Sequence, residues 1–196
     1  PDMAKRMPNC THMRMTNMNE NCWDYGIKYV TMYDEEYDNI IINLPNLQCL
    51  NTASTGHMFS NILDLSMKTK MIELKTERCI IPPVSLTALS MTDDNATIDL
   101  SGFTQLTKLE LCRCPNVSNY LMSQLRVLSI DDHNPIDNLV HLKLEELHLG
   151  GSKLPLLPAT LKKLTLVSCS DAVLPMINLT SLDVRNGTVD YNVFSS

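Results

Sequence analysis

Three residues of the types that serine hydrolases use recur at a fixed spacing in this sequence. Glu110, Ser129 and His148 are each 19 residues apart, so a repeating fold would bring them onto neighbouring strands. In a catalytic triad the histidine lies between the nucleophile and the acid, whereas here the serine takes the central place. Glu146 could orient His148, but an open sheet face supplies no oxyanion hole. We therefore expect no enzymatic activity and keep a hydrolase only as an alternative.

Cysteines and acidic residues supply candidate metal ligands. Cys112, Cys114 and Cys169 carry zinc-binding side chains, but a tetrahedral zinc site needs four ligands that converge. Alternation along a strand sends Cys112 outward and Cys114 toward the core. The acidic pairs at 93–94 and 131–132 are typical of turns. We therefore expect no metal and no cofactor.

The pattern that would position these side chains is a repeat. The stretch from Leu161 to Cys169 has the form LxxLxLxxC, in which Leu164 and Leu166 are separated by a polar residue. A strand with this alternation buries its leucines on one side and exposes the residues between them. One such unit cannot bury its leucines alone, so similar units must stack on it.

Ten units of this kind follow one another along the chain. The positions equivalent to Leu164, which we call anchors, are 17 to 22 residues apart and all apolar. The anchors are Met13, Val30, Leu50, Ile72, Leu89, Leu109, Leu128, Leu147, Leu164 and Leu182. Two residues after the anchor only Thr52 is polar, and three residues before it only Thr69 is polar. The pattern is weaker between residues 20 and 80, where residues 62–65 offer a competing register for the fourth unit.

The repeated unit resembles the leucine-rich repeat family over residues 7 to 187. The stretches 106–114 and 144–152 look like that family's LxxLxLxx(N/C) core. The resemblance implies an α/β horseshoe, with a curved parallel β-sheet on the concave face and mostly 3-10 and extended segments, with little helix, on the convex face. The family's usual asparagine is missing from the last position throughout, which predicts irregular turns after the strands.

Residues 1–196 are expected to form a single domain of about ten repeats. A solenoid exposes apolar surface at both ends unless the ends are covered, and neither end of this sequence has a capping pattern. We therefore expect the domain to belong to a longer chain or a complex, in which another domain or subunit covers the termini.

Composition excludes several kinds of partner. A net charge of −6, a pI near 5.3 and scattered basic residues argue against nucleic acid as the main ligand. No apolar run approaches the roughly 18 residues that a membrane span needs, and the first residues do not resemble a signal peptide. Seven cysteines without a terminal cluster favour an intracellular, cytoplasmic protein with reduced thiols. Five Asn-x-Ser/Thr sequons keep a secreted, glycosylated protein as the alternative.

The residues between the leucines form the candidate binding surface. Positions one before, one after and three after each anchor face outward on the concave side, and the residue after the anchor is polar in all ten units. Both signs of charge alternate there, which suits a protein partner better than a polyanion. The candidate partner-binding residues are His12, Arg14, Tyr29, Tyr33, Glu73, Lys75, Lys108, Glu110, Asp131, Glu146, His148, Lys163, Asp183 and Arg185.

Two patches on this surface differ in character. The first combines aromatic and basic residues of the types enriched at interface hot spots, although its tyrosines could instead shield a frayed edge; its members are His12, Arg14, Tyr29 and Tyr33. The second is either a charged specificity surface or an ordinary solvated sheet face; its members are Lys108, Glu110, Asp131, Glu146, His148 and Lys163.

The sequence therefore predicts a non-enzymatic scaffold that binds a protein partner through the concave face. Within this class, three roles stay open: the substrate-recognition subunit of a ubiquitin ligase, the sensing part of an immune receptor, and an accessory subunit of a large assembly. A secreted or surface recognition receptor is the alternative from another class.

Overall fold

In the residues that it describes, the computed structural model has sixteen β-strands. The residues that it describes are 11–15, 27–32, 41, 44–52, 63–77, 80–92, 97–114, 116–118, 123–131, 138–151, 154–169, 172–174, 178–187 and 189–190.

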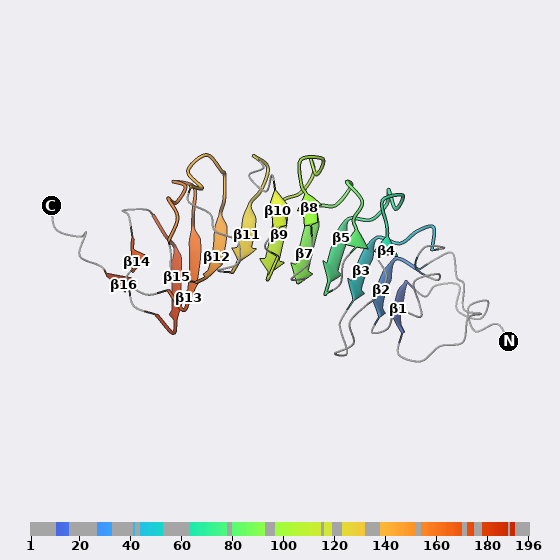
Figure 1. Ribbon diagram of the computed structural model, residues 1–196, viewed down its shortest axis with the longest axis horizontal. Helices are drawn as coiled ribbons and strands as arrows, with labels where there is room; N and C mark the ends of the chain where they lie inside the picture. Colours follow the sequence, from blue (N-terminus) through green and yellow to red (C-terminus); the bar gives the residue numbers. More distant parts are fainter. Residues whose placement is uncertain are drawn as a thin grey trace.

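Ten of the strands lie side by side in one parallel sheet (Figure 1). In spatial order they are β1 (His12–Met15), β2 (Tyr29–Met32), β3 (Cys49–Thr52), β5 (Glu73–Thr76), β7 (Ala88–Thr92), β9 (Lys108–Cys112), β11 (Val127–Ile130), β12 (Glu146–Gly150), β13 (Lys163–Val167) and β15 (Ser181–Arg185). The spatial order follows the chain, so each strand is one turn of a coil.

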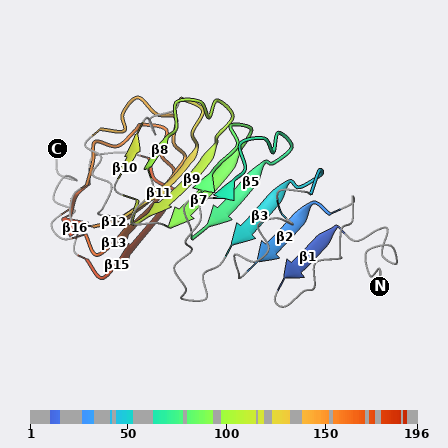
Figure 2. The same ribbon diagram turned by 45° about the vertical axis from the view of Figure 1, so that its right-hand side comes forward.

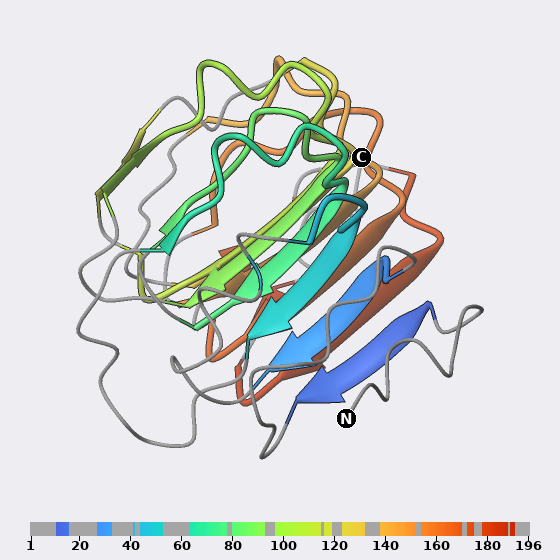
Figure 3. The same ribbon diagram turned by 90° about the vertical axis from the view of Figure 1, so that its right-hand side faces the viewer.

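The six remaining strands are short and pair in twos on the return path of the coil. These parallel pairs are β4 (Leu63–Asp64) with β6 (Ile80–Ile81), β8 (Thr97–Asp99) with β10 (Asn116–Ser118), and β14 (Ala172–Val173) with β16 (Val189–Asp190). Figure 2 shows β8 and β10 set apart from the sheet strands, and Figure 3, which looks along the row of strands, shows short green strands across the coil from the sheet. One side of the sheet therefore faces the return path, and the other side faces outward.

A ladder of backbone hydrogen bonds joins each turn to the next. The carbonyl oxygen of Thr87 accepts hydrogen bonds from two consecutive amides of the next turn, Thr107 at 2.9 Å and Lys108 at 3.1 Å. The same arrangement recurs from the turn of Thr11 to that of Lys162. This ladder fixes the register of neighbouring repeats, because shifting one turn would break both bonds.

The apolar columns of the repeats pack into one continuous core between the sheet and the return path. In β9, Leu109 and Leu111 are buried, whereas the residues that alternate with them are partly or fully exposed. In β15, Leu182 and Val184 are only partly buried, because no further described turn stacks on that strand. Burial thus depends on a neighbouring repeat, as the sequence predicts.

The return segments are built from turns rather than helices. The carboxylate of Asp99 accepts a hydrogen bond from the amide of Ser101 at 2.9 Å, and the buried Leu100 between them accepts one from the amide of Phe103 at 3.0 Å. A hydrogen bond between residues three apart closes a tight turn. This turn directs the apolar side chain of Leu100 into the core. Within the described residues Ile41 alone is helical, so the prediction of a parallel solenoid with little helix is confirmed there.

The fourth repeat differs from the sequence prediction. The sequence pattern places its anchor at Ile72, and this is wrong, because Leu74 pairs with the anchors of β3 and β7. Leu74 is 1% exposed, whereas Ile72 is 43% exposed. The position three residues before the anchor is consequently held by Met71, which is fully buried, and not by Thr69.

A buried pair of threonines accompanies this register. The hydroxyl of Thr52 donates a hydrogen bond to that of Thr76 at 3.0 Å inside the core, so two polar groups satisfy each other. The repeat before the corrected anchor therefore spans 24 residues and the one after it 15, outside the predicted range of 17 to 22. Glu73 and Lys75 stay on the outward side, but Lys75 takes the position after the anchor that the sequence pattern gives to Glu73.

The turns after the strands recur in one form and are not irregular in the repeats that the structure describes there. Four residues after the anchor the backbone is left-handed in Arg113, Gly151, Ser168 and Asn186. One residue later, Cys114 and Cys169 are buried, and their thiols lie 3.3 Å and 3.7 Å from backbone carbonyl oxygens of their own turns. Cysteine thus fills the final position of the motif as a small apolar residue.

Candidate functional site

Two columns of residues, defined by the register of the strands, run across the solvent-facing side of the ten-stranded sheet, which we call the outer face. The column before the anchors contains His12, Tyr29, Cys49, Glu73, Ala88, Lys108, Val127, Glu146, Lys163 and Ser181. The column after the anchors contains Arg14, Thr31, Asn51, Lys75, Ser90, Glu110, Ser129, His148, Thr165 and Asp183. The second column has no apolar member over ten strands.

An aromatic pair lies at the β1 end of the outer face. The rings of His12 and Tyr29 stack with centroids 4.3 Å apart and planes inclined by 10°, and the hydroxyl of Thr11 lies 2.8 Å from Nδ1 of His12. The stacking distance is close to the spacing of adjacent strands, about 4.8 Å. Both ring planes are therefore roughly perpendicular to the direction in which one strand follows the next. Of the other residues predicted for this patch, Arg14 has a described backbone but no described side chain, and Tyr33 lies outside the described residues.

A depression of about 490 Å³ adjoins the aromatic pair. Its lining residues are His12, Tyr29, Val30, Thr31, Cys49, Leu50, Asn51, Glu73 and Lys75. Among the described residues, Oδ1 of Asn51 is the one buried side-chain oxygen or nitrogen without a hydrogen-bond partner. Leaving such an atom unpaired costs about 1–3 kcal/mol, so a ligand that donates a hydrogen bond to it would be stabilised there.

The charged patch consists of two ion-paired groups. On β9, Nζ of Lys108 lies 2.9 Å from the carboxylate of Glu110. On β12 and β13, the carboxylate of Glu146 binds Nε2 of His148 at 2.9 Å and Nζ of Lys163 at 3.3 Å. Exposed pairs of this kind contribute about 0–1 kcal/mol to stability, so their main effect is on the charge pattern that the face presents.

The protonation equilibria of the patch favour the charged forms. The hydrogen bond from His148 is the main cause that holds the pKa of Glu146 below its ordinary value. Partial burial acts to raise the pKa of Glu110, but hydrogen bonds from Lys108 and Ser90 outweigh it and the pKa is lowered. The hydrogen bond to Glu110 is likewise the main cause that raises the pKa of Lys108. At neutral pH this patch therefore presents carboxylates and ammonium groups side by side.

Three further predicted residues make local contacts near the ends of their strands. The carboxylate of Asp131 accepts a hydrogen bond of 2.6 Å from the amide of Arg113, whose backbone is left-handed (φ 53°). This contact gives Asp131 a role in shaping a turn. The guanidinium of Arg185 binds the carboxylate of Asp183 at 2.6 Å at the opposite end of the outer face from the aromatic pair.

The three residues with hydrolase-like spacing do lie on adjacent strands. Ser129 is paired in register with Glu110 on one side and with His148 on the other. The Nε2 atom of His148 nevertheless contacts Glu146, two residues away on its own strand. His148 therefore contacts the carboxylate of Glu146. Ser129 lies between Glu110 and His148 in the sheet, which is not the order of a catalytic triad.

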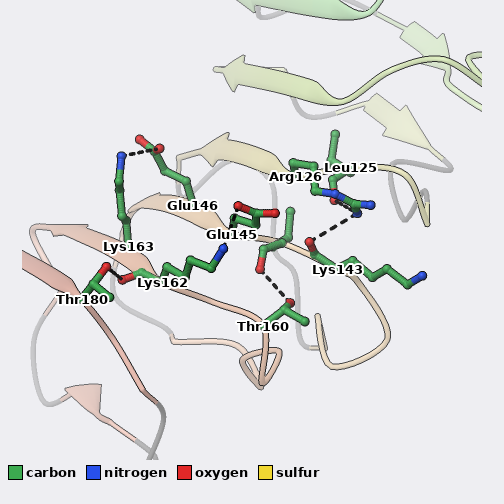
Figure 4. A network of polar contacts seen from close by, with 10 residues as sticks. Leu125, Arg126, Lys143, Glu145, Glu146, Thr160, Lys162, Lys163 and Thr180 are labelled. Atoms are coloured by element: carbon green, nitrogen blue, oxygen red, sulfur yellow. Dashed lines mark hydrogen bonds and ion pairs between the residues drawn. The ribbon is translucent and has the colours of Figure 1, made fainter.

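Sequence reasoning missed a polar edge where β11, β12 and β13 begin. Figure 4 shows Nζ of Lys162 reaching the carboxylate of Glu145, at 3.1 Å, and the guanidinium of Arg126 reaching backbone carbonyls, including that of Lys143 at 3.4 Å. These residues border a depression of about 410 Å³. Arg126, Glu145 and Lys162 all stand two residues before an anchor, and this common position is the signal that would have found them.

Comparison with known proteins adds no assignment. No family model matches the sequence, and no curated protein matches it.

In the described part of the chain, no cluster of three or more histidine, cysteine, aspartate or glutamate side chains is arranged to hold a metal ion. Cys112 is exposed and Cys114 is buried, as alternation predicts. Among the residues that are described, no helix has the length and apolar character needed to cross a membrane.

Proposed function

We propose that the chain is a solenoid of the leucine-rich repeat type that binds a protein partner through the outer face of its sheet. The observation that carries this proposal is the second column of that face, whose residues are polar on all ten strands, while from β2 to β13 the residues that alternate with them are buried. Stability alone does not require this composition, because exposed sheet positions also accept β-branched and aromatic residues.

The dimensions of the outer face support a protein partner. Ten strands spaced by about 4.8 Å form a row about 45 Å long, and strands of about five residues make it about 15 Å wide. The resulting area, on the order of 700 Å², is close to the roughly 800 Å² that each partner contributes to a standard interface. The described return segments lie across the coil from the sheet (Figure 3), so they do not cover this face.

The charge pattern supports a partner with its own mixed surface. Acidic and basic side chains alternate along the face, as in the groups around Glu110 and Glu146. Alternating charge favours a complementary protein surface over a uniformly charged polymer. In this proposal the paired charges set specificity and orientation, and the aromatic pair of His12 and Tyr29 supplies contact area.

Matched arginine substitutions on the two sides of the coil test the proposal. The native partner is first isolated by affinity purification from the source of the protein, and its binding is then measured with purified components. Ser129→Arg puts a bulky cation at the centre of the outer face, whereas Met67→Arg does so on the return path, where Met67 is 86% exposed. We expect Ser129→Arg to weaken binding at least about tenfold and Met67→Arg to leave it unchanged. The reverse result would reject the outer face as the binding surface.

A further inference from the structure

The aromatic pair leaves a slot beside it on the outer face. One side of the Tyr29 ring is covered by His12, and the other side points along the column toward β3 and β5. The next residue of the column is Cys49, which is short, and the one after it is Glu73. A space over Cys49 is thus bounded by an aromatic ring on one side and a carboxylate on the other, within the 490 Å³ depression.

The width of the slot matches one planar group. Tyr29 and Glu73 lie two strands apart, which corresponds to about 9.6 Å between their backbones. The Glu73 carboxylate lies 4.0 Å from Cys49 Sγ, so the space beside Tyr29 is narrower than this backbone spacing. A flat group packed against the ring needs about 3.5 Å, so the space accepts one layer and not a second. Cys49 lies at the bottom of the slot. Burial raises the pKa of its thiol and keeps it neutral, so it adds no charge to the slot.

The polar atoms at the slot are hydrogen-bond acceptors. Oδ1 of Asn51 is buried and has no partner among the described residues. The carboxylate of Glu73 lies 4.0 Å from the sulfur of Cys49, and its charge also acts on Lys108 and helps to raise the pKa of that lysine. Lys75 also lines the depression, so one cation already adjoins these acceptors, and its charge contributes to lowering the pKa of Glu110 two strands away. Two acceptors and an aromatic face select a planar group that donates several hydrogen bonds and carries positive charge.

We propose that this slot binds the guanidinium of an arginine presented by the protein partner. The inference rests on the proposed function and specifies the chemistry of that partner. The guanidinium stacks on the free side of Tyr29 and donates hydrogen bonds to Glu73 and, once the Asn51 side chain rotates to expose its buried Oδ1, to that oxygen. Lysine is a poorer match, because its ammonium is not planar and cannot stack while it donates to two acceptors in one plane. A stacked cation on tyrosine with a charged hydrogen bond is a recurrent hot-spot arrangement.

A peptide titration tests the slot without the native partner. The probe is the capped peptide Gly-Arg-Gly, compared with the same peptides carrying citrulline or lysine, and binding is followed through the NMR signals of the Asn51 amide and the Tyr29 ring. We expect a dissociation constant on the order of 1–10 mM for the arginine peptide. Citrulline keeps the planar shape without the charge, and lysine keeps the charge without the plane, so both should bind at least about fivefold more weakly. Equal binding of either peptide would overturn the proposal.

A pair of small-to-leucine substitutions in one column provides the matched control. Cys49→Leu fills the slot without removing an acceptor, and Ala88→Leu adds the same side chain on the other side of Glu73. We expect Cys49→Leu to weaken binding of the arginine peptide at least about tenfold and Ala88→Leu to leave it unchanged, with both variants unfolding at the wild-type temperature. If Cys49→Leu unfolds early, Glu73→Gln replaces it, with an expected loss of about tenfold. Unchanged binding in the folded slot variant contradicts the proposal.

The two proposals can fail separately. If the native partner is lost with Ser129→Arg but retained with Cys49→Leu, the outer face binds the partner and the arginine slot is wrong. If the arginine peptide binds in the slot but Ser129→Arg leaves the native partner bound, the slot is a real site and the proposed use of the whole face is wrong.

Discussion

Replacing Leu74 by alanine is expected to lower the free energy of unfolding by about 3 kcal/mol. The side chain is 1% exposed and lies between the buried anchors of β3 and β7. Truncating a leucine in such surroundings removes transfer free energy and leaves a cavity, which together cost about 2–5 kcal/mol. Ile72 is 43% exposed, so Ile72→Ala should cost about 1 kcal/mol or less.

Urea titration followed by far-ultraviolet circular dichroism measures both changes. With a slope of about 2 kcal/mol per molar urea, Leu74→Ala should lower the midpoint by about 1.5 M and Ile72→Ala by about 0.5 M or less. As a control, the dependence of the free energy of unfolding on urea concentration should be the same in both variants and the wild type, which shows that the same transition is measured. A larger loss with Ile72→Ala than with Leu74→Ala would refute the register, because it would make Ile72 the core anchor that the sequence pattern suggests.

Three further changes probe the repeats. Thr76→Val leaves the buried hydroxyl of Thr52 without its acceptor and should cost about 1–2 kcal/mol, whereas the double valine variant should cost less than the sum of the single changes in the same titration. Gly187→Ala should cost about 1–3 kcal/mol, since a Cβ there would lie 2.1 Å from a backbone carbonyl oxygen of the preceding repeat; a wild-type midpoint would contradict this contact. Hydrogen bonds from Ser66 lower the pKa of Asp64 from 3.8, so its stabilisation is present above that value and lost as the pH falls through the lower folded-state pKa. The difference in melting temperature between wild type and Asp64→Ala should therefore vanish at low pH, and a difference that grows there would contradict the assignment.

The parallel sheet and its core follow from the sequence because one rule governs all ten units. A strand that alternates leucine with polar residues needs a like neighbour on each side. Nine of the ten predicted anchors, including Leu109, Leu147 and Leu164, occupy the anchor column of the sheet. The leucine-rich repeat assignment, the intracellular setting and the lack of catalysis stay predictions.

The fourth repeat could not be placed from the pattern because its most apolar register is not the one that forms. Ile72 and Leu74 give a better apolar alternation than Leu74 and Thr76. In the register that forms, Thr52 and Thr76 share a hydrogen bond inside the core. The sequence shows only a polar residue at a core position of the third unit. Two polar exceptions at the same column of adjacent repeats are a signal for such a bond.

The outer face was predictable as a surface, but its local groupings were not. Alternation identifies Tyr29, Glu73 and His148 as outward residues. The stacking of Tyr29 on His12 and the contact of His148 with Glu146 depend on side-chain rotamers. The sequence pattern does not specify these rotamers. The contact of Asp131 with a left-handed turn depends in the same way on a backbone conformation that one residue type does not reveal.

Site-specific photo-crosslinking can identify which side of the coil contacts the partner. A benzoylphenylalanine at Ser129 reports contacts of the outer face, and one at Ser101, which is exposed in a turn of the return path, reports contacts of the opposite side. With the native partner bound, we expect crosslinks from position 129 and none from position 101. Crosslinks from position 101 alone would contradict the account, because the partner would then bind the return side of the solenoid.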